Sequence, residues 1–368
     1  MLKIPFYSFD QIHGELKSEI FSALDRCYNE SQFILGKDLI EFETEYAAFN
    51  KTAYCIGTAN GLDSLHLSLK SIGIQKGDEV LVSAHTYVAT FLAIIFCGAT
   101  PIPIDADQNT MNIDVNKIES FITSKTKAII PVHLYGQPCN MESIMQIANK
   151  KNLFVIEDNA QSQGATFNGQ LTGTFGIANA TSFYPGKNIG ALGDGGAITT
   201  NDKTINERLR KLRNYGSSEK YIHEIIGYNS RLDSIQASIL KIKLKYLNKW
   251  NQERASIAAK YHSYLSKVDG IELPIIHEKA NSVYHQFVIR NSDRDNLKLE
   301  LEKLGVQTLI HYPIPVHLQQ AFNFLNYTTG DFPITEKISK ECLSLPIYPG
   351  LRDNQIEYIS EAIIKNVH

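Results

Sequence analysis

Short apolar runs alternate with helix-like patterns through the first half of the chain. Four of these runs have the length of a buried strand, and they predict strands over residues 79–82, 101–104, 128–132 and 153–156. Helical patterns lie between them, over residues 87–97 and 141–151. Fully apolar strands that alternate with helices are typical of βαβ units, so the sequence predicts a mainly parallel sheet with helices on both faces.

The pattern changes after about residue 205. It predicts one or two long helices over residues 241–265, strands over residues 285–289 and 308–312, and helices over residues 294–304 and 354–364. A further helix over about residues 14–29 could pack on either part. We therefore expect an α/β protein with a large domain over residues 1–245 and a smaller C-terminal α/β domain over residues 246–368.

Composition narrows the class of protein. Hydrophobic residues make up 43% and charged residues 20%, which allows a sizeable core. The net charge of -3 argues against a nucleic-acid-binding or membrane-surface protein. Five widely spaced cysteines without a CxxC pair favour buried thiols over disulfides or a metal site. The first residues lack a secretory pattern, and the longest apolar stretch, residues 88–99, is too short to span a bilayer, so we expect a cytoplasmic protein.

Lys187 lies in a loop crowded with glycines, over residues 182–196. A P-loop would need glycine in place of Thr181 and a hydroxyl residue in place of Asn188. The dinucleotide fingerprint fails as well, because Ile198 stands where its third glycine belongs. Two interpretations stay open: a lysine that forms a Schiff base with a flat cofactor, for which the glycines leave room, or a turn with a solvated lysine.

Asp158 follows the predicted strand over residues 153–156, at the end where ligands bind in parallel sheets. Its carboxylate could hold the ring nitrogen of a pyridoxal cofactor in the protonated state, or it could cap a helix.

Residues 60–63 are predicted to begin a helix, because Leu62, Leu65 and Leu69 share helical spacing, and Asn60 is the candidate N-cap. Backbone N–H groups at such a start can bind a phosphate, although most helix starts bind nothing. Tyr87, just after another strand, could stack on a planar ring or simply be half-buried.

These features occur in the order helix start, aromatic residue, aspartate and lysine. In this arrangement the chain resembles the DegT/StrS family of sugar aminotransferases over nearly its whole length. The motifs that carry the resemblance are residues 60–65, 132–136, 156–161, 182–196 and 229–233. The resemblance implies fold type I of the pyridoxal-phosphate-dependent transferases, the aspartate aminotransferase fold.

The resemblance also implies roles for single residues. Lys187 would bind pyridoxal 5'-phosphate covalently and shuttle a proton, Asp158 would contact the pyridine nitrogen, Gln161 would lie near the ring hydroxyl, and Tyr87 would stack on the ring. Phosphate contacts are implied for Gly61, Leu62, Ser182 and, from the neighbouring subunit, Asn229. A homodimer with shared active sites is therefore expected.

Two comparisons with the family refine this expectation. Many relatives have threonine where this chain has Leu62, so one side-chain contact with the phosphate is absent. Some relatives replace the lysine with histidine and act as sugar dehydrases, whereas this chain keeps Lys187, which favours transamination.

Residues 183–191 and 308–317 look most like the enzymes that aminate carbon 3 of dTDP-linked 6-deoxy sugars. The implied reaction converts a dTDP-3-keto-6-deoxyhexose into the 3-amino sugar, with the galacto product favoured over the gluco product. L-glutamate would be the donor and leave as 2-oxoglutarate, the cofactor would alternate with pyridoxamine 5'-phosphate, and the product would feed surface polysaccharide such as the lipopolysaccharide O-antigen. Candidate sugar contacts are Tyr184, His311, Tyr312 and His317, and each histidine could equally be structural.

Two alternatives stay open. The first is amination at carbon 4 of a nucleotide-linked keto sugar. The second is a non-catalytic regulatory protein that binds pyridoxal phosphate on the same fold.

Overall fold

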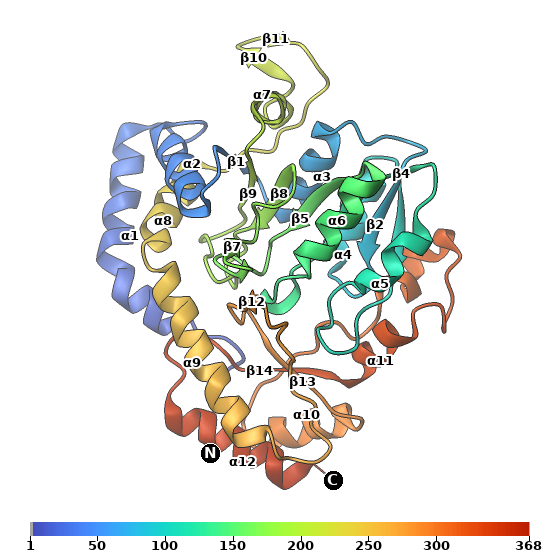
Figure 1. Cartoon of the computed structure of the whole chain (residues 1–368). Coiled ribbons are helices and arrows are strands. Elements are labelled where there is room, and N and C mark those ends of the chain that lie inside the picture. Colours follow the sequence, from blue (N-terminus) through green and yellow to red (C-terminus); the bar gives the residue numbers. More distant parts are fainter. Residues whose placement is uncertain (1–2, 368) are drawn as a thin grey trace.

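The computed structural model describes residues 3–367 and has a seven-stranded sheet at its centre, in the order β1-β9-β8-β5-β4-β2-β3 (Figure 1). In that order the strands are Tyr54–Thr58, Gly196–Thr200, Ala178–Ser182, Phe154–Asp158, Thr126–Ile130, Glu79–Ser83 and Thr100–Ile104. Strand β9 runs antiparallel to both neighbours and the remaining pairs are parallel. The predicted α/β fold with a mainly parallel sheet is confirmed.

Helices cover both faces of this sheet because its strands are apolar on both sides. In β2, Val80 and Val82 pack with α3 (Gly61–Ser71) and α4 (Val88–Phe96). Leu81 faces the opposite side and packs with α5 (Val115–Ile118) and α6 (Met141–Lys151).

The remaining helices of the first 265 residues flank the β1 end of the sheet or lead away from it (Figure 1). They are α1 Asp10–Glu30, α2 Lys37–Asn50, α7 Lys203–Leu212, α8 Ser234–Leu244 and α9 Leu247–Leu265. The N-terminal helix α1 packs mainly on α8, where Leu16 and Ile20 share a buried cluster with Ile239 and Ile242. The helices expected over residues 241–265 are thus two, α8 and α9. The domain boundary at residues 245/246 falls between them and stays a prediction.

The C-terminal part is built around a two-stranded antiparallel sheet, β13 (Phe287–Arg290) and β14 (Cys342–Leu345). Helices α9, α10 (Arg294–Lys303) and α12 (Asp353–Asn366) enclose it in one apolar cluster. Helix α11 (Pro333–Glu341) leads into β14. Figure 1 shows α9 running from the side of the large sheet into this group.

Short elements complete the chain. The small strands are β6 Thr166–Phe167, β7 Gln170–Leu171, β10 Ser217–Glu219, β11 Ile222–His223 and β12 Ala280–Asn281, and the 3-10 turns are η1 Glu119–Phe121, η2 Leu134–Gly136, η3 Val316–Leu318 and η4 Gln320–Leu325. Between residues 3 and 367, no helix is long and apolar enough to cross a membrane. All five cysteines are free and buried.

One predicted element is wrong. The strand expected over residues 308–312 is a single antiparallel bridge between Leu309 and Ser344. The chain leaves β14 after this pair, and Pro313 and Pro315 have no N–H group with which to continue a ladder. The segment is therefore a loop, and it runs toward the carboxyl edge of the large sheet.

Candidate active site

Four of the predicted site features lie at one edge of the sheet for a topological reason. Strands β1, β2, β5 and β8 all run in the same direction, so their carboxyl ends meet at the same edge. The helix start at Gly61 follows β1, Tyr87 follows β2, Asp158 ends β5 and the loop of Lys187 follows β8. Since β9 is antiparallel to β8, this loop turns back at the edge and stays there.

Lys187 and Asp158 lie near enough to each other at this edge for the charge of each to influence the pKa of the other. Asp158 is buried, and its carboxylate accepts hydrogen bonds from the Thr90 hydroxyl at 2.9 Å and the Ala160 backbone N–H at 3.2 Å. Burial raises the pKa of Asp158, against the effect of these bonds and of Lys187. Removal from water lowers the pKa of Lys187 to about 8, although Asp158 acts in the opposite direction. Asp158 ends a strand and caps no helix.

Hydrogen bonds from other parts of the chain fix the position of the loop of Lys187. The buried Lys243 of α8 donates a hydrogen bond to the Gly190 carbonyl at 2.6 Å. The amide of Asn188 donates to Asn251 of α9 at 2.8 Å and to the Val283 carbonyl at 3.1 Å. The loop is thus fixed by α8, α9 and the C-terminal part together.

Three of the predicted phosphate contacts, Gly61, Leu62 and Ser182, lie at or beside the start of α3. Asn60 caps this helix, its side chain accepting from the Asp63 N–H at 2.8 Å, as predicted. This cap leaves the N–H groups of Gly61 and Leu62 at the helix start for an anion. A Cβ on Gly61 would lie 2.6 Å from the Cβ of Ser182, so the helix start and the end of β8 are in close contact.

Two tyrosine rings, Tyr87 and Tyr312, and the amide of Gln161 form a further group of contacts in the site. The rings of Tyr87 and Tyr312 are 5.3 Å apart. The side chain of Gln161 donates to the Tyr312 hydroxyl at 3.3 Å and accepts from the Tyr135 N–H at 2.7 Å. Tyr312 thus enters the site from the loop that was predicted as a strand. Tyr87 keeps 55% of its surface exposed, which leaves its face open to a planar ligand.

His311 also approaches the lysine. Burial and, second, the charge of Lys187 lower the pKa of His311 to about 4, so its ring is neutral at neutral pH. Its Nδ1 lies 2.8 Å from the Ser344 hydroxyl. Tyr184, three residues before Lys187, is 60% exposed beside the site.

Two of the predicted site residues, His317 and Asn229, pair with residues outside the group described above. The ring of His317 is buried against Phe332, and its Nε2 lies 3.2 Å from a carboxylate oxygen of Glu336. Asn229 is exposed and its backbone pairs with Asn214. The next residue, Ser230, accepts a hydrogen bond from the Ala59 N–H at 3.2 Å, so this motif lies beside the start of α3.

Sequence reasoning missed the residues that support the site. Thr90 was missed although it lies one helical turn after Tyr87, a spacing that would bring it to the same strand ends. Tyr135 lies within the motif over residues 132–136, but the motif by itself indicates no role for it. Lys243 carried no signal, since a lysine in a helical pattern is normally solvated.

The sequence matches the model of the DegT/DnrJ/EryC1/StrS aminotransferase family over residues 15–364. The dTDP-3-amino-3,6-dideoxy-alpha-D-galactopyranose transaminase of Aneurinibacillus thermoaerophilus is 49% identical over 98% of both chains. The erythromycin biosynthesis sensory transduction protein EryC1 of Saccharopolyspora erythraea is 43% identical over 97% of this chain and 98% of its own.

Among solved structures, DesV from S. venezuelae in complex with a ketimine intermediate superposes with a TM-score of 0.98. It is 41% identical, and the match covers 99% of this chain and 98% of that one. The cofactor of the family is pyridoxal 5'-phosphate.

The residues present fit this cofactor. A buried carboxylate whose pKa burial raises gains a cationic partner when a ring nitrogen lies against it, and the lowered pKa of Lys187 favours a nucleophilic amine. The helix start beside Ser182 suits the phosphate. The chain belongs to the DegT/DnrJ/EryC1/StrS aminotransferase family.

Proposed function

We propose that the protein transfers the amino group of L-glutamate to carbon 3 of a dTDP-3-keto-6-deoxyhexose. The products are 2-oxoglutarate and a dTDP-3-amino-3,6-dideoxyhexose, with the galacto sugar favoured over the gluco sugar. The convergence of the start of α3, Tyr87, Asp158 and the loop of Lys187 at one edge of the sheet is the observation that carries the aminotransferase reaction. The choice of sugar is supported by the 49% identical relative, which is named for the galacto product.

Lys187 is the base and acid of this reaction. When bound, pyridoxal phosphate supplies an electron sink that stabilises negative charge on the carbon next to the reacting nitrogen. In the first half-reaction, the Nζ atom of Lys187 accepts the proton that leaves the α-carbon of the donor. In the second, it delivers a proton to carbon 3 of the sugar. A pKa near 8 suits both transfers, because both protonation states are accessible near neutral pH.

The other residues hold and orient the cofactor. The Asp158 carboxylate would hold the ring nitrogen, and the Gln161 amide would lie near the ring hydroxyl. Tyr87, which is exposed, would stack on the ring. The Gly61 and Leu62 N–H groups and Ser182, which lie together at the edge of the sheet, would bind the phosphate.

The sugar nucleotide occupies the side of the site formed by Tyr184, His311 and Tyr312. Tyr184 is exposed on the loop of the lysine, and His311 and Tyr312 come from the C-terminal part. A neutral imidazole and phenol hydroxyls are suited to hydrogen bonds with sugar hydroxyl groups. Because His317 is paired with Glu336, we assign it no direct contact.

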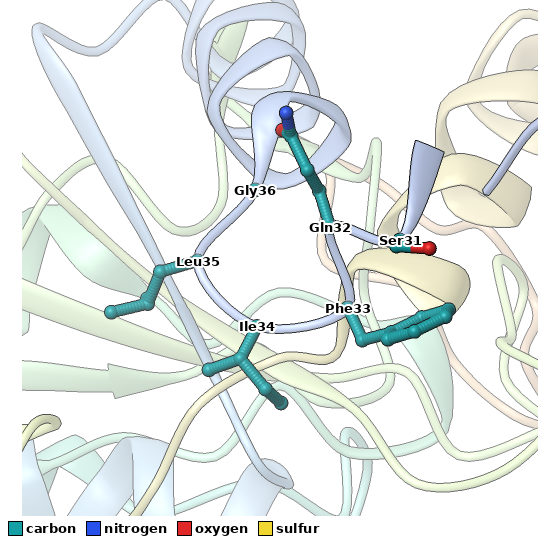
Figure 2. A pocket seen from close by; sticks show the side chains of 6 residues that line it. All are labelled: Ser31, Gln32, Phe33, Ile34, Leu35 and Gly36. Atoms are coloured by element: carbon teal, nitrogen blue, oxygen red, sulfur yellow. The ribbon is translucent and has the colours of Figure 1, made fainter. Parts of the chain in front are cut away.

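We further propose a homodimer in which Asn229 completes the phosphate site of the partner. Apolar side chains are exposed on two segments near this motif, in the manner of an interface. Tyr221, in the turn of the β10–β11 hairpin, is 82% exposed, and Ile226, just after it, is 91% exposed; the hairpin projects beyond the sheet (Figure 1). Figure 2 shows Phe33 and Ile34 projecting from the loop over residues 31–36, and both are exposed.

Mixed dimers test the shared site. Lys187→Ala removes the lysine that binds the cofactor. Asn229→Asp weakens binding of the phosphate, because it places a carboxylate next to that anion. In a mixed dimer of the two variants, one site carries both substitutions and the other carries neither, if the site is shared. Activity is then expected to return on mixing, and its failure to return would contradict sharing.

The reaction is tested with the purified enzyme. Glutamate should convert the bound cofactor to pyridoxamine phosphate, which is followed by absorbance. A panel of dTDP- and UDP-linked 3-keto and 4-keto 6-deoxyhexoses is then added, and the original absorbance should return with the dTDP-linked 3-keto galacto sugar. Return with the gluco epimer only, or with a 4-keto sugar only, would transfer the assignment to that substrate.

One relative, EryC1, is named as a sensory transduction protein, so a regulatory role is the second candidate. The same experiment separates the two. A cofactor that binds but reacts with neither glutamate nor any keto sugar would favour the regulatory role. Under the enzymatic role, we place the reaction in the cytoplasm, in the supply of amino sugars for surface polysaccharide such as O-antigen.

A further inference from the structure

The turn over residues 134–136 joins the cofactor edge of the large sheet to the C-terminal part. Its Tyr135 carbonyl accepts a hydrogen bond from the Gln286 N–H at 3.2 Å, and its Gly136 carbonyl accepts one from the Val283 N–H at 3.0 Å. A Cβ on Gly136 would lie 2.7 Å from the backbone nitrogen of His285, so only glycine allows this approach. The turn therefore connects the large sheet to the C-terminal part through backbone hydrogen bonds and close backbone packing.

The backbone of Tyr135 fixes the orientation of the Gln161 amide. A backbone N–H can only donate, and it lies 2.7 Å from Oε1 of Gln161. The amide nitrogen of Gln161 must therefore point the other way, where it donates to the Tyr312 hydroxyl at 3.3 Å. Tyr135 has a φ angle of 62°, which lies in the left-handed region that non-glycine residues rarely adopt. This backbone conformation directs the N–H group toward Gln161.

The side chain of the same residue holds the C-terminal loop. The Tyr135 hydroxyl donates to the backbone carbonyl of His311. Since that hydroxyl has a single hydrogen, the Nε2 atom of His85, at 2.7 Å, must donate to its oxygen. Burial lowers the pKa of His85 to about 4, so this ring is neutral and its one proton is on Nε2. Tyr135 and His85 are buried and His311 is half-buried, and each bond is therefore sensitive to loss of its partner.

We propose that Tyr135 is a positioning residue that places the sugar-side residues His311 and Tyr312 relative to the cofactor-side Gln161. One residue bonds Gln161 through its N–H and the His311 carbonyl through its hydroxyl, while Gln161 in turn bonds Tyr312. The proposal rests on the proposed function insofar as His311 and Tyr312 contact the sugar nucleotide.

The test is Tyr135→Phe in the cofactor-loaded enzyme, with Tyr261→Phe as the matched control. Tyr261 is also buried and donates its hydroxyl to a backbone carbonyl, that of Pro346, at 2.9 Å, but it lies in the core of the C-terminal part. Hydrogen exchange measured by mass spectrometry should become about tenfold faster in peptides covering residues 308–317 for Tyr135→Phe, which corresponds to about 1.4 kcal/mol for the lost hydrogen bond. Tyr261→Phe should leave these peptides unchanged.

Kinetics provide the second readout. Tyr135→Phe should raise the KM for the sugar nucleotide about tenfold, and change the glutamate half-reaction less than about twofold. His85→Leu removes the donor to the Tyr135 hydroxyl and should also raise this KM and speed hydrogen exchange over residues 308–317. It replaces Tyr135→Phe in the test if that variant does not fold. Unchanged exchange over residues 308–317, or equal effects of Tyr135→Phe and Tyr261→Phe, would overturn the proposal. If the wild type converts no keto sugar, the proposed function fails, while the exchange result still decides the role of Tyr135.

Discussion

The hydroxyl of Thr90 donates a hydrogen bond to the buried carboxylate of Asp158 at 2.9 Å. Thr90 belongs to α4, the helix that Tyr87 begins, so one helix supplies both the aromatic residue and the support of the carboxylate. This bond stabilises the ionised form of Asp158, whose pKa burial raises. The ionised form is the one that can hold a protonated ring nitrogen.

We expect Asp158→Asn to lower kcat by a factor of about 10²–10³, because the amide cannot hold the ring nitrogen in its protonated form. Thr90→Val, which removes only the hydrogen bond, should raise the pKa of Asp158 further and cause a smaller loss. Steady-state kinetics with matched circular dichroism spectra check both variants. Equal activity of Asp158→Asn and wild type would remove Asp158 from the site.

Lys187→Ala should fold and bind pyridoxal phosphate without a covalent bond, and it should lose turnover by at least about 10³-fold, because the Nζ atom that moves the proton is gone. Borohydride reduction followed by mass spectrometry measures the covalent bond. Lys203→Ala, at the exposed start of α7, is the control and should behave as wild type. Substantial turnover by Lys187→Ala would contradict the assignment.

Capture of pyridoxal phosphate by the apoenzyme should depend on pH with a midpoint near 8. Only the neutral amine attacks the aldehyde, so the rate should rise as pH increases through the pKa of Lys187. Because Asp158 raises this pKa, Asp158→Asn should move the midpoint lower. Stopped-flow absorbance measures the rate. A midpoint near 10.5, the ordinary lysine value, would show that Lys187 is not removed from water.

His311→Gln and His317→Gln should separate the two histidines. Loss of His311 should raise the KM for the sugar nucleotide about tenfold, since its ring lies near Lys187, and should lower stability by about 1 kcal/mol, since Ser344 loses a hydrogen-bond partner. Loss of His317 should lower stability by about 1–3 kcal/mol, since Glu336 loses a buried partner, with an unchanged KM. Urea unfolding and steady-state kinetics distinguish these outcomes, and the reverse pattern would assign the sugar contact to His317.

Lys243→Met should change the pH dependence of stability. Burial lowers the pKa of Lys243 from 10.5 to about 8, so between these pH values the unfolded chain binds one more proton than the folded chain. Wild-type stability gains from this group as pH rises through that window, by roughly 3 kcal/mol, and the variant lacks this gain. Urea unfolding at several pH values tests it, with the exposed Lys245→Met at the end of α8 as control. A difference in the free energy of unfolding between wild type and Lys243→Met that does not change with pH would contradict the lowered pKa of Lys243.

Local pattern was sufficient for much of the fold. The apolar strands β2 to β5 and the helices α4 and α6 were predicted with ends within two residues, because fully buried strands and amphipathic helices have distinct periods. Strands β1, β8 and β9 were not predicted, since their small and polar residues resemble turn sequence. The strand expected over residues 308–312 was wrong because a β-branched and apolar composition does not reveal where a partner strand ends.

By itself, the sequence determined the types of site residue and their order: a capped helix start, an aromatic residue, a strand-end aspartate and a loop lysine. Each follows from a local rule of helix capping, strand ends or glycine-rich turns. Tertiary structure decided the surroundings of these residues. The Thr90 support of Asp158, the Lys243 contact with Gly190 and the Tyr135 contact with His311 join residues 68, 53 and 176 positions apart. Such contacts, and the pKa shifts that come with burial, depend on how the elements pack, which no local pattern encodes.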